Sequence, residues 1–273
     1  MNKHILKIRD FQTGGFTIIE LLVVISILGL ISSIALANLE SAKSKAKEAA
    51  GKQFHATLQR TLGVDTIARW EFDEGGGDTA LDSSGNGLDG TITGAQRTLD
   101  GINGSALSFG GNGYISGGGF PGSGGNSNAT VAVWVKPTTG ADTNTIFRVG
   151  DSGCTVLEVG ITSGRIYALR DTAELPTISN RIISNNIWQN LAVVFNDSSI
   201  DTYINGTEVN SIYNIDLTTC ETEEWTIGSS VNGANGFDGL MDRLQIYGVS
   251  LTAKEVQKVY AQGLESRATL AGI

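Results

Sequence analysis

One acidic side chain lies within the most apolar segment of the chain. Residues 16–37 read FTIIELLVVISILGLISSIALA, and Glu20 is the only charged residue among them. A carboxylate without a partner in the hydrocarbon core of a membrane costs on the order of 2.5 kcal/mol or more. We therefore expect Glu20 to be a functional residue, and we expect its partner to be a cation.

The apolar segment itself is long enough to cross a membrane as a helix. Its 22 residues match a hydrocarbon core of about 30 Å at a rise of about 1.5 Å per residue. Lys3, Lys7 and Arg9 precede it, which places the amino terminus in the cytoplasm and the residues beyond about 38 outside. A secretory signal peptide is the alternative, but its apolar core is usually about 7 to 15 residues long.

The helix is expected to continue beyond the membrane. After Asn38 the sequence becomes amphipathic, and Gly63 is a suitable C-terminal stop. The sequence therefore predicts one helix over residues 16–62, about 70 Å long. The apolar positions of its second half recur at spacings of three and four; they are Ala42, Ala46, Ala49, Ala50, Phe54, Leu58 and Leu62.

The residues before the apolar segment add a processing signal. A short basic leader, residues 1–15, ends in GG, and the sequence GGFTIIE at residues 14–20 resembles the prepilin cleavage and methylation motif of type IV pilins and type II secretion pseudopilins. The resemblance implies that a prepilin peptidase cleaves between Gly15 and Phe16 and methylates the new amine. Glu20 would then pair with the amine of a neighbouring subunit during assembly. The alternative is a plain signal anchor, in which Glu20 reaches the water at the headgroups.

Charge is divided unevenly along the chain. Residues 1–62 contain eight Lys or Arg and four Asp or Glu, whereas the remaining residues contain 11 and 24. The net charge of −9 is thus the sum of a basic stalk and an acidic head, and the negative charge of the head argues against general nucleic-acid binding there. Both histidines, His4 and His55, precede the head, which excludes Ser-His-Asp and Cys-His catalysis there.

The head, residues 64–265, is predicted to be all-β. Residues 130–136, 164–170, 188–195, 199–205 and 240–247 read as strands, and Gly, Asn, Asp and Ser separate them. Many short strands with tight turns favour an antiparallel sandwich or jelly roll. The sequence TAKE at 252–255 is typical of a capping box, and a tail follows at 266–273. The expected architecture is a long, membrane-spanning N-terminal α-helix, then an antiparallel jelly-roll sandwich with one short C-terminal helix.

Four segments of the head together resemble laminin-G-like, concanavalin A-like jelly-roll domains. They are residues 70–90, 131–137, 188–209 and 237–256, and their order matches. Such domains often hold a structural calcium ion, and the resemblance implies that oxygen ligands come from Asp73, Asp82, Asn86 and Asp242.

The segment DSSGNG at residues 82–87 also resembles the first half of an EF-hand loop. A complete EF-hand is not expected, because Thr93 stands at the twelfth position and no helices flank the segment. The alternative to a calcium site is a turn with acidic residues at the surface.

The two cysteines of the chain both lie in the head. Cys154 and Cys220 both lie on the extracytoplasmic side, where disulfides persist, so a bridge is expected, with two buried thiols as the alternative.

Glu71 and Asp73 begin the alternating carboxylate pattern of some glycosidases, but Glu74 is out of phase by one residue. We therefore predict that the protein is not an enzyme.

Two functions remain open. In the first, the protein is a pilin-like subunit whose head binds a glycan or a surface protein in adhesion. In the second, it is a minor pseudopilin of a type II secretion or DNA-uptake machine, and its head has no ligand. Either subunit would cross the cytoplasmic membrane once with its head outside, and would meet a prepilin peptidase and other pilin subunits before entering a pilus or pseudopilus.

Overall fold

The computed structural model describes residues 18–28, 65–121, 128–138, 143–151, 155–170, 177–213, 222, 224–230 and 233–270. The chain divides into two compact units, Met1–Thr57 and Leu58–Ile273. Several predicted features lie outside the described residues. They are the leader 1–15 with its cleavage site at Gly15 and Phe16, most of the helix predicted over 16–62, and both Cys154 and Cys220.

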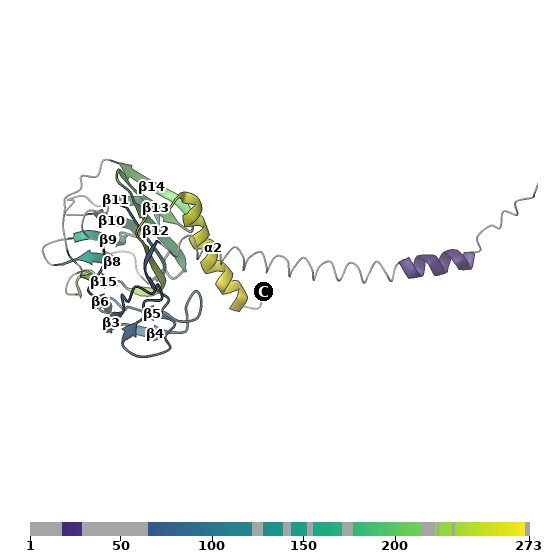
Figure 1. Ribbon diagram of the computed structural model, residues 1–273, viewed down its shortest axis with the longest axis horizontal. Helices are drawn as coiled ribbons and strands as arrows, with labels where there is room; N and C mark the ends of the chain where they lie inside the picture. Colours follow the sequence, from purple (N-terminus) through teal and green to yellow (C-terminus); the bar gives the residue numbers. More distant parts are fainter. Residues whose placement is uncertain are drawn as a thin grey trace, which may run out of the picture. The chain divides into compact units, whose positions relative to one another are not determined.

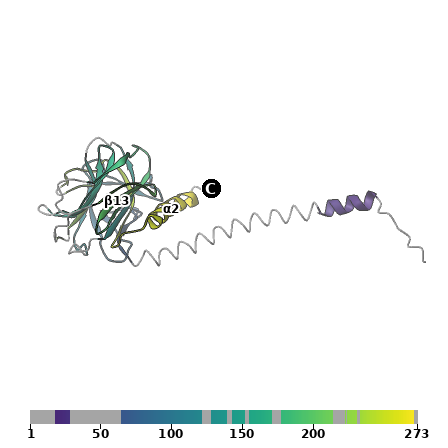
Figure 2. The ribbon, with the colours of Figure 1, turned by 90° about the horizontal axis from the view of Figure 1, so that it is seen from above.

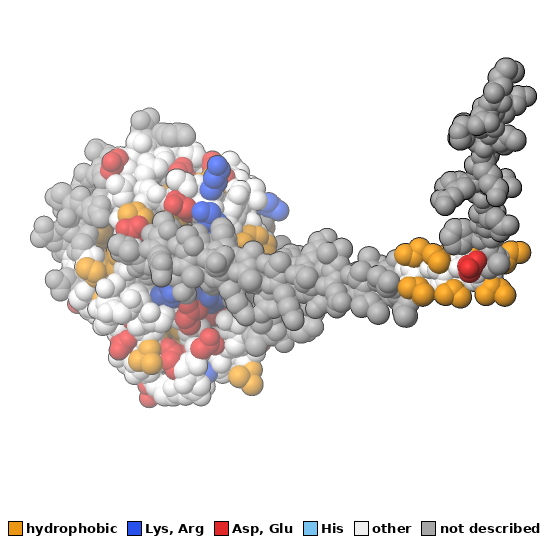
Figure 3. All heavy atoms as spheres, turned by 45° about the vertical axis from the view of Figure 1, so that its right-hand side comes forward, with side chains coloured by type: hydrophobic (Ala, Val, Ile, Leu, Met, Phe, Trp, Pro, Cys, Tyr) orange, Lys and Arg blue, Asp and Glu red, His pale blue; other side chains and the backbone are white. Residues whose placement is uncertain are grey.

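In the first unit, residues 18–28 form an α-helix. Its side chains are exposed and almost all apolar (Figure 3), and Glu20 is the one charged residue in this range. The hydroxyl of Ser26 donates a hydrogen bond of 2.7 Å to the carbonyl of Leu22, one turn earlier. No helix in the described part of the chain is both long and apolar enough to cross a membrane.

The second unit, the head, consists of two β-sheets (Figure 1), and the strand pairs among its described residues are antiparallel. The first sheet pairs strands that are far apart in the sequence, since β7 lies between β12 and β16. In spatial order its strands are β14 (Thr207–Tyr213), β13 (Ser199–Ile204), β12 (Gln189–Phe195), β7 (Ala129–Pro137), β16 (Gly239–Tyr247), β5 (Ala106–Ser108) and β4 (Gln96–Thr98), with β1 (Thr66–Trp70) paired to β16.

The second sheet also pairs strands that are far apart in the sequence, since β15 lies between β8 and β6. Such long crossovers are typical of a jelly roll, so the fold class predicted for the head is confirmed. In spatial order its strands are β11 (Thr177–Ile182), β10 (Arg165–Arg170), β9 (Thr155–Thr162), β8 (Asn144–Gly150), β15 (Trp225–Ile227), β6 (Tyr114–Gly117), β3 (Gly90–Thr93) and β2 (Thr79–Ala80).

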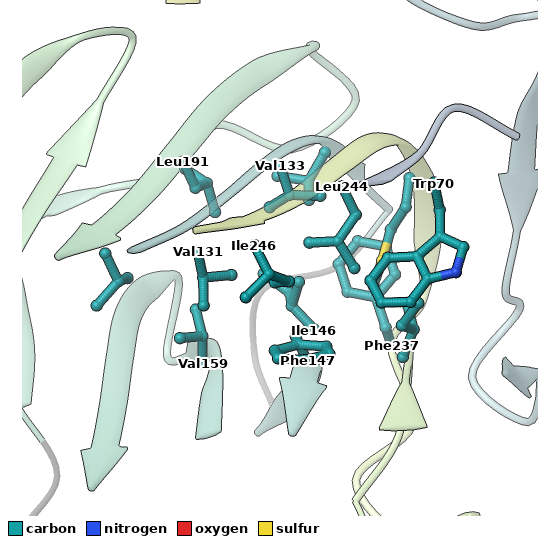
Figure 4. Packing of buried hydrophobic residues seen from close by; sticks show 14 of the residues in the cluster. Trp70, Val131, Val133, Ile146, Phe147, Val159, Leu191, Phe237, Leu244 and Ile246 are labelled. Carbon is teal, nitrogen blue, oxygen red and sulfur yellow. The ribbon is translucent and has the colours of Figure 1, made fainter. Parts of the chain in front are cut away.

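Apolar side chains from both sheets fill the space between them (Figure 4). Trp70 of β1 is fully buried, and its ring centroid lies 4.7 Å from that of Trp225 in the opposite sheet. Each large apolar side chain buried in this way contributes about 1.5–3 kcal/mol to stability. Among the described residues, the buried members of the two apolar clusters lie between Ala68 and Val259, so the head has a core of its own and can fold without the residues before it.

A helix covers the outer face of the first sheet. Helix α2 (Ala253–Leu270) lies beside the sandwich (Figures 1 and 2), and its Val256 and Val259 pack with Ala192 and other outward residues of β7, β12, β13 and β16 in a second apolar cluster. The predicted capping box is confirmed, because the backbone nitrogen of Thr252 donates to Glu255 Oε2 at 2.8 Å. The helix continues to Leu270 and so extends into the segment predicted as a tail.

Candidate cation site

Among the described carboxylates of the head, Asp242 is the most deeply buried. It lies in β16 and is completely buried. Its Oδ2 accepts hydrogen bonds from the backbone nitrogens of Ile102, at 2.8 Å, and Asn103, at 3.2 Å. Its Oδ1 is buried and has no hydrogen-bond partner among the described residues. A buried carboxylate oxygen without a partner carries a high desolvation cost unless a cation compensates it.

The backbone of β16 is distorted where Asp242 lies. The register with β7 shifts between Asp242 and Gln245, and Arg243 adopts a left-handed conformation with φ of 51°. A bulge of this kind redirects a side chain out of the regular alternation of the strand. Asp242 itself is still paired with Trp134 of β7, so the distorted residue is Arg243, whose side chain lies against Glu71.

Burial raises the pKa of Asp242 to about 8. The two backbone N–H donors and the nearby Arg243 oppose this shift, whereas the negative charge of Asp73 adds to it. The folded head without a cation therefore holds a proton on Asp242 at neutral pH that the unfolded chain releases. A divalent cation would instead stabilise the ionised form.

Asp73 is the second carboxylate of this region. It follows Phe72, which is fully buried and has a φ of 59°, an outlier for a bulky residue. Asp73 Oδ1 accepts a hydrogen bond of 2.7 Å from the backbone nitrogen of Ser105. Gly104 has a φ of 78°, and a Cβ atom there would overlap Asp73 Oδ1. Asp73 and Asp242 thus hold opposite ends of one short loop, residues 102–105.

This pair fits a hard cation such as calcium. Calcium takes six to eight oxygen ligands, and carboxylates, carbonyls and waters all serve. The orphan Oδ1 of Asp242 and the exposed carboxylate of Asp73 provide two anionic donors. No group of three or more His, Cys, Asp or Glu side chains suited to a metal occurs among the described residues, so the other ligands would be main-chain or amide oxygens and water.

The other two predicted ligands, Asp82 and Asn86, lie in a separate turn. Both oxygens of Asp82 already accept hydrogen bonds, from the backbone of Arg69 and Leu88 and from Ser84. Burial raises the pKa of Asp82, but these hydrogen bonds outweigh it and leave the pKa lowered. The structure therefore brings Asp73 and Asp242 together, but not Asp82 and Asn86.

The turn at residues 82–88 covers the free edge of β1. The side-chain amide of Asn86 donates to the carbonyls of Thr66 and Ile67, at 3.0 and 2.9 Å, and the backbone nitrogen of Ser83 donates to the carbonyl of Arg69. Unpaired strand edges favour association with other strands, so a covered edge protects the head from aggregation. Asp82 and Asn86 have this structural role whether or not a cation binds.

The carboxylates next to Asp73 are engaged in ion pairs. β1 ends at Trp70, so the strand alternation expected for Glu71 and Asp73 was wrong. Glu71 Oε2 lies 2.9 Å from Arg243 Nε, and Glu74 Oε2 lies 2.6 Å from Arg97 Nη1. Sequence reasoning did not identify Arg243, because no sequence signal shows that its side chain crosses from β16 to Glu71.

Two other features lie away from the carboxylate pair. On the second sheet, Glu158 lies 3.2 Å from Arg148 Nε and accepts hydrogen bonds from Thr145 and Tyr167; desolvation and this carboxylate raise the pKa of Tyr167. A small, open and mainly apolar pocket includes Arg170. Neither contains any of the predicted ligands.

An antiparallel sandwich with these crossovers is a lectin-type jelly roll. The chain belongs to the concanavalin A-like lectin/glucanase superfamily, whose family model matches residues 109–257. The model of the prokaryotic N-terminal methylation motif matches residues 12–36. Both resemblances seen in the sequence are therefore confirmed. No curated protein sequence matches the chain.

Solved structures share the fold of the head. Domain 4 of AbnA, an extracellular GH43 arabinanase from Geobacillus stearothermophilus in complex with arabinotriose, has a TM-score of 0.58 at 23% identity, over 72% of this chain and 98% of that one. A structure of botulinum neurotoxin type C, whose cell entry depends on two ganglioside molecules, gives 0.61 at 14%, over 75% and 53%. Trypanosoma rangeli sialidase with the inhibitor DANA gives 0.56 at 14%, over 71% and 32%. This chain thus spans about half of the toxin chain, and these identities show the fold alone.

Proposed function

We propose that the protein is a pilin-like subunit whose jelly-roll head binds a glycan or a surface protein in adhesion. The observation that carries the proposal is the presence, in one chain, of the N-terminal methylation motif and a lectin-type head with its own core. The first part provides assembly and the second provides a surface to display.

Assembly would begin with processing at the membrane. A prepilin peptidase would cleave after Gly15 and methylate the amine of Phe16, while the single apolar span holds the subunit in the cytoplasmic membrane with its head outside. Glu20 lies on the exposed surface of an apolar helix, and a cation beside it would stabilise the carboxylate in lipid. The methylated amine of a neighbouring subunit is the partner that we propose, which would fix the axial position of each subunit in the filament.

The glycan or protein ligand is supported by what related folds do. The arabinanase domain was solved with arabinotriose, and entry of the neurotoxin depends on gangliosides. We further propose that Asp73 and Asp242 hold a structural calcium ion that fixes the loop at 102–105. The ion would neutralise two neighbouring carboxylates and give the orphan oxygen of Asp242 a partner.

A binding role without catalysis is proposed for the head. Glu71 and Glu74, the carboxylates next to Asp73, are each held in an ion pair, and Asp73 itself accepts a backbone hydrogen bond. Neither of the two histidines lies in the head. These residues therefore do not form a free pair of carboxylates suited to glycoside hydrolysis.

A glycan array tests the adhesion proposal directly. The head, residues 64–273, is probed with 1 mM calcium and again with a chelator, next to a tag-only control. Specific binding to a defined sugar class is expected. Absence of binding to any glycan and to host or surface proteins, together with a few copies per cell envelope, would instead support the minor pseudopilin whose head has no ligand.

A further inference from the structure

We infer that the ion pair between Glu71 and Arg243 is the element that positions the two carboxylates of the cation site. The inference rests on the calcium role proposed above. Glu71 lies two residues before Asp73, and Arg243 directly follows Asp242. The 2.9 Å contact between Arg243 Nε and Glu71 Oε2 therefore ties together the two chain segments that carry the ligands.

The ion pair lies where the pairing of β1 with β16 ends. The antiparallel register of these two strands ends with Trp70 opposite Leu244; beyond it the segment with Asp73 leaves the sheet, whereas β16 stays paired with β7 through Asp242. No backbone pairing between β1 and β16 continues past this point in the described residues. The side-chain contact takes its place.

Backbone strain on both sides makes such a restraint necessary. Phe72 and Arg243 both have a positive φ, of 59° and 51°, and such conformations cost of order 1–3 kcal/mol each. Phe72 is held by its buried ring. The Arg243 side chain is only 12% exposed and points toward Glu71, so the ion pair is the corresponding anchor on β16.

Arg69 does not duplicate this function. Its Nε lies 3.9 Å from Glu71 Oε1, but both residues belong to the same segment of chain. Among the described residues, it is the ion pair with Arg243 that joins the Glu71 side chain to β16. The charge environment of Glu71 thus includes two arginines, of which one bridges the strands.

A positioning role and a purely electrostatic effect predict opposite changes in calcium affinity for Arg243→Gln. If charge alone mattered, Glu71→Gln would weaken calcium binding, because it removes a nearby negative charge, and Arg243→Gln would strengthen it. If the ion pair positions the ligands, both substitutions weaken binding. Loss of residues that orient metal ligands typically costs about 10–100-fold in affinity, and we expect roughly tenfold for this partly exposed pair.

Calorimetric titration of the head, residues 64–273, with calcium chloride decides between these cases. Glu71→Gln, Arg243→Gln and the double variant should each bind about tenfold more weakly than the wild type, since the second substitution removes nothing further. Arg243→Lys, which keeps a cation within reach of Glu71, should recover most of the affinity. Glu208→Gln and Arg165→Gln make the same charge changes away from the site and should leave the affinity within about twofold.

Melting temperatures in chelator check that every variant is folded. Tighter binding by Arg243→Gln, or affinities within twofold for both single variants, would overturn the inference while leaving the calcium role intact. If the wild-type head binds no calcium at all, the proposed calcium role fails and the inference fails with it. If the double variant loses the product of the two single effects, the residues act independently and the ion pair is not the positioning element.

Discussion

Replacing Asp242 by asparagine should stabilise the head in the absence of calcium and abolish its response to calcium. Burial raises the pKa of Asp242 from 3.8 to about 8. Because the folded state binds this proton more tightly, the group is most favourable at low pH, and the calcium-free head loses stability as pH rises from about 4 to about 8. At pH 7 the loss of stability caused by this shift is at most about 4 kcal/mol, at 1.36 kcal/mol per pKa unit.

Asparagine removes this penalty while retaining the same shape. Its carbonyl oxygen can still accept from the backbone nitrogens of Ile102 and Asn103, as Asp242 Oδ2 does. The new amide group replaces an orphan oxygen and itself lacks a partner, which returns about 1–3 kcal/mol of the gain. A net stabilisation of about 1–3 kcal/mol remains, equivalent to roughly 2–12 °C in Tm for a domain of about 200 residues.

Calcium, in contrast, should stabilise the wild-type head and not the Asn variant. At a concentration 100 times its Kd, a ligand stabilises the wild-type head by about 2.7 kcal/mol, or roughly 5–11 °C, and the Asn variant should show no shift. Differential scanning calorimetry at pH 7, with chelator and with calcium, measures all four values, and Asp82→Asn provides the control from the separate turn. A calcium-free Asn variant that melts below the wild type, yet keeps the full calcium shift, would refute the reasoning.

Three other substitutions test separate parts of the account. Glu20→Ala should leave membrane insertion intact but remove the subunit from sheared filaments, whereas Ser26→Ala should assemble normally; assembly of the Glu20 variant would exclude the proposed charge pair. Gly263→Ala places a Cβ atom against the Trp134 indole and should cost about 1–3 kcal/mol by thermal melting, while Gly76→Ala, which meets no neighbour, should have little effect. Thr252→Ala removes the two hydrogen bonds that the Thr252 hydroxyl makes with Glu255 at the start of α2 and should lower stability by about 1 kcal/mol; an unchanged Tm would show that α2 does not depend on them.

The strands of the head could be predicted because alternation and turn residues occur together. The segments predicted at 130–136, 199–205 and 240–247 correspond to β7, β13 and β16 within one or two residues. The capping box of α2 could be predicted equally well, because a Thr and a Glu three residues apart can each accept a hydrogen bond from the backbone N–H of the other. These features depend on local sequence, which is why the sequence alone indicated them.

The cation site was only partly predictable for a physical reason. Asp, Ser, Asn and Gly form calcium loops, but the same residues also form tight turns by bonding to their own backbone. The segment with Asp82 and Asn86 is of the second kind, since it caps the edge of β1. Asp242 could be recognised only through the resemblance, and the left-handed conformations of Phe72 and Arg243 have no signature in residue type.

The most direct test of the central claim is the intact mass and N-terminal sequence of the protein in filaments sheared from cells. A chain that begins at Phe16, carries one added methyl group and retains the complete head is the predicted result. It would show that the methylation motif operates and that the lectin-type head is displayed on an assembled filament. A chain that still begins at Met1 in cells with an active prepilin peptidase, and that is absent from the sheared fraction, would contradict the account.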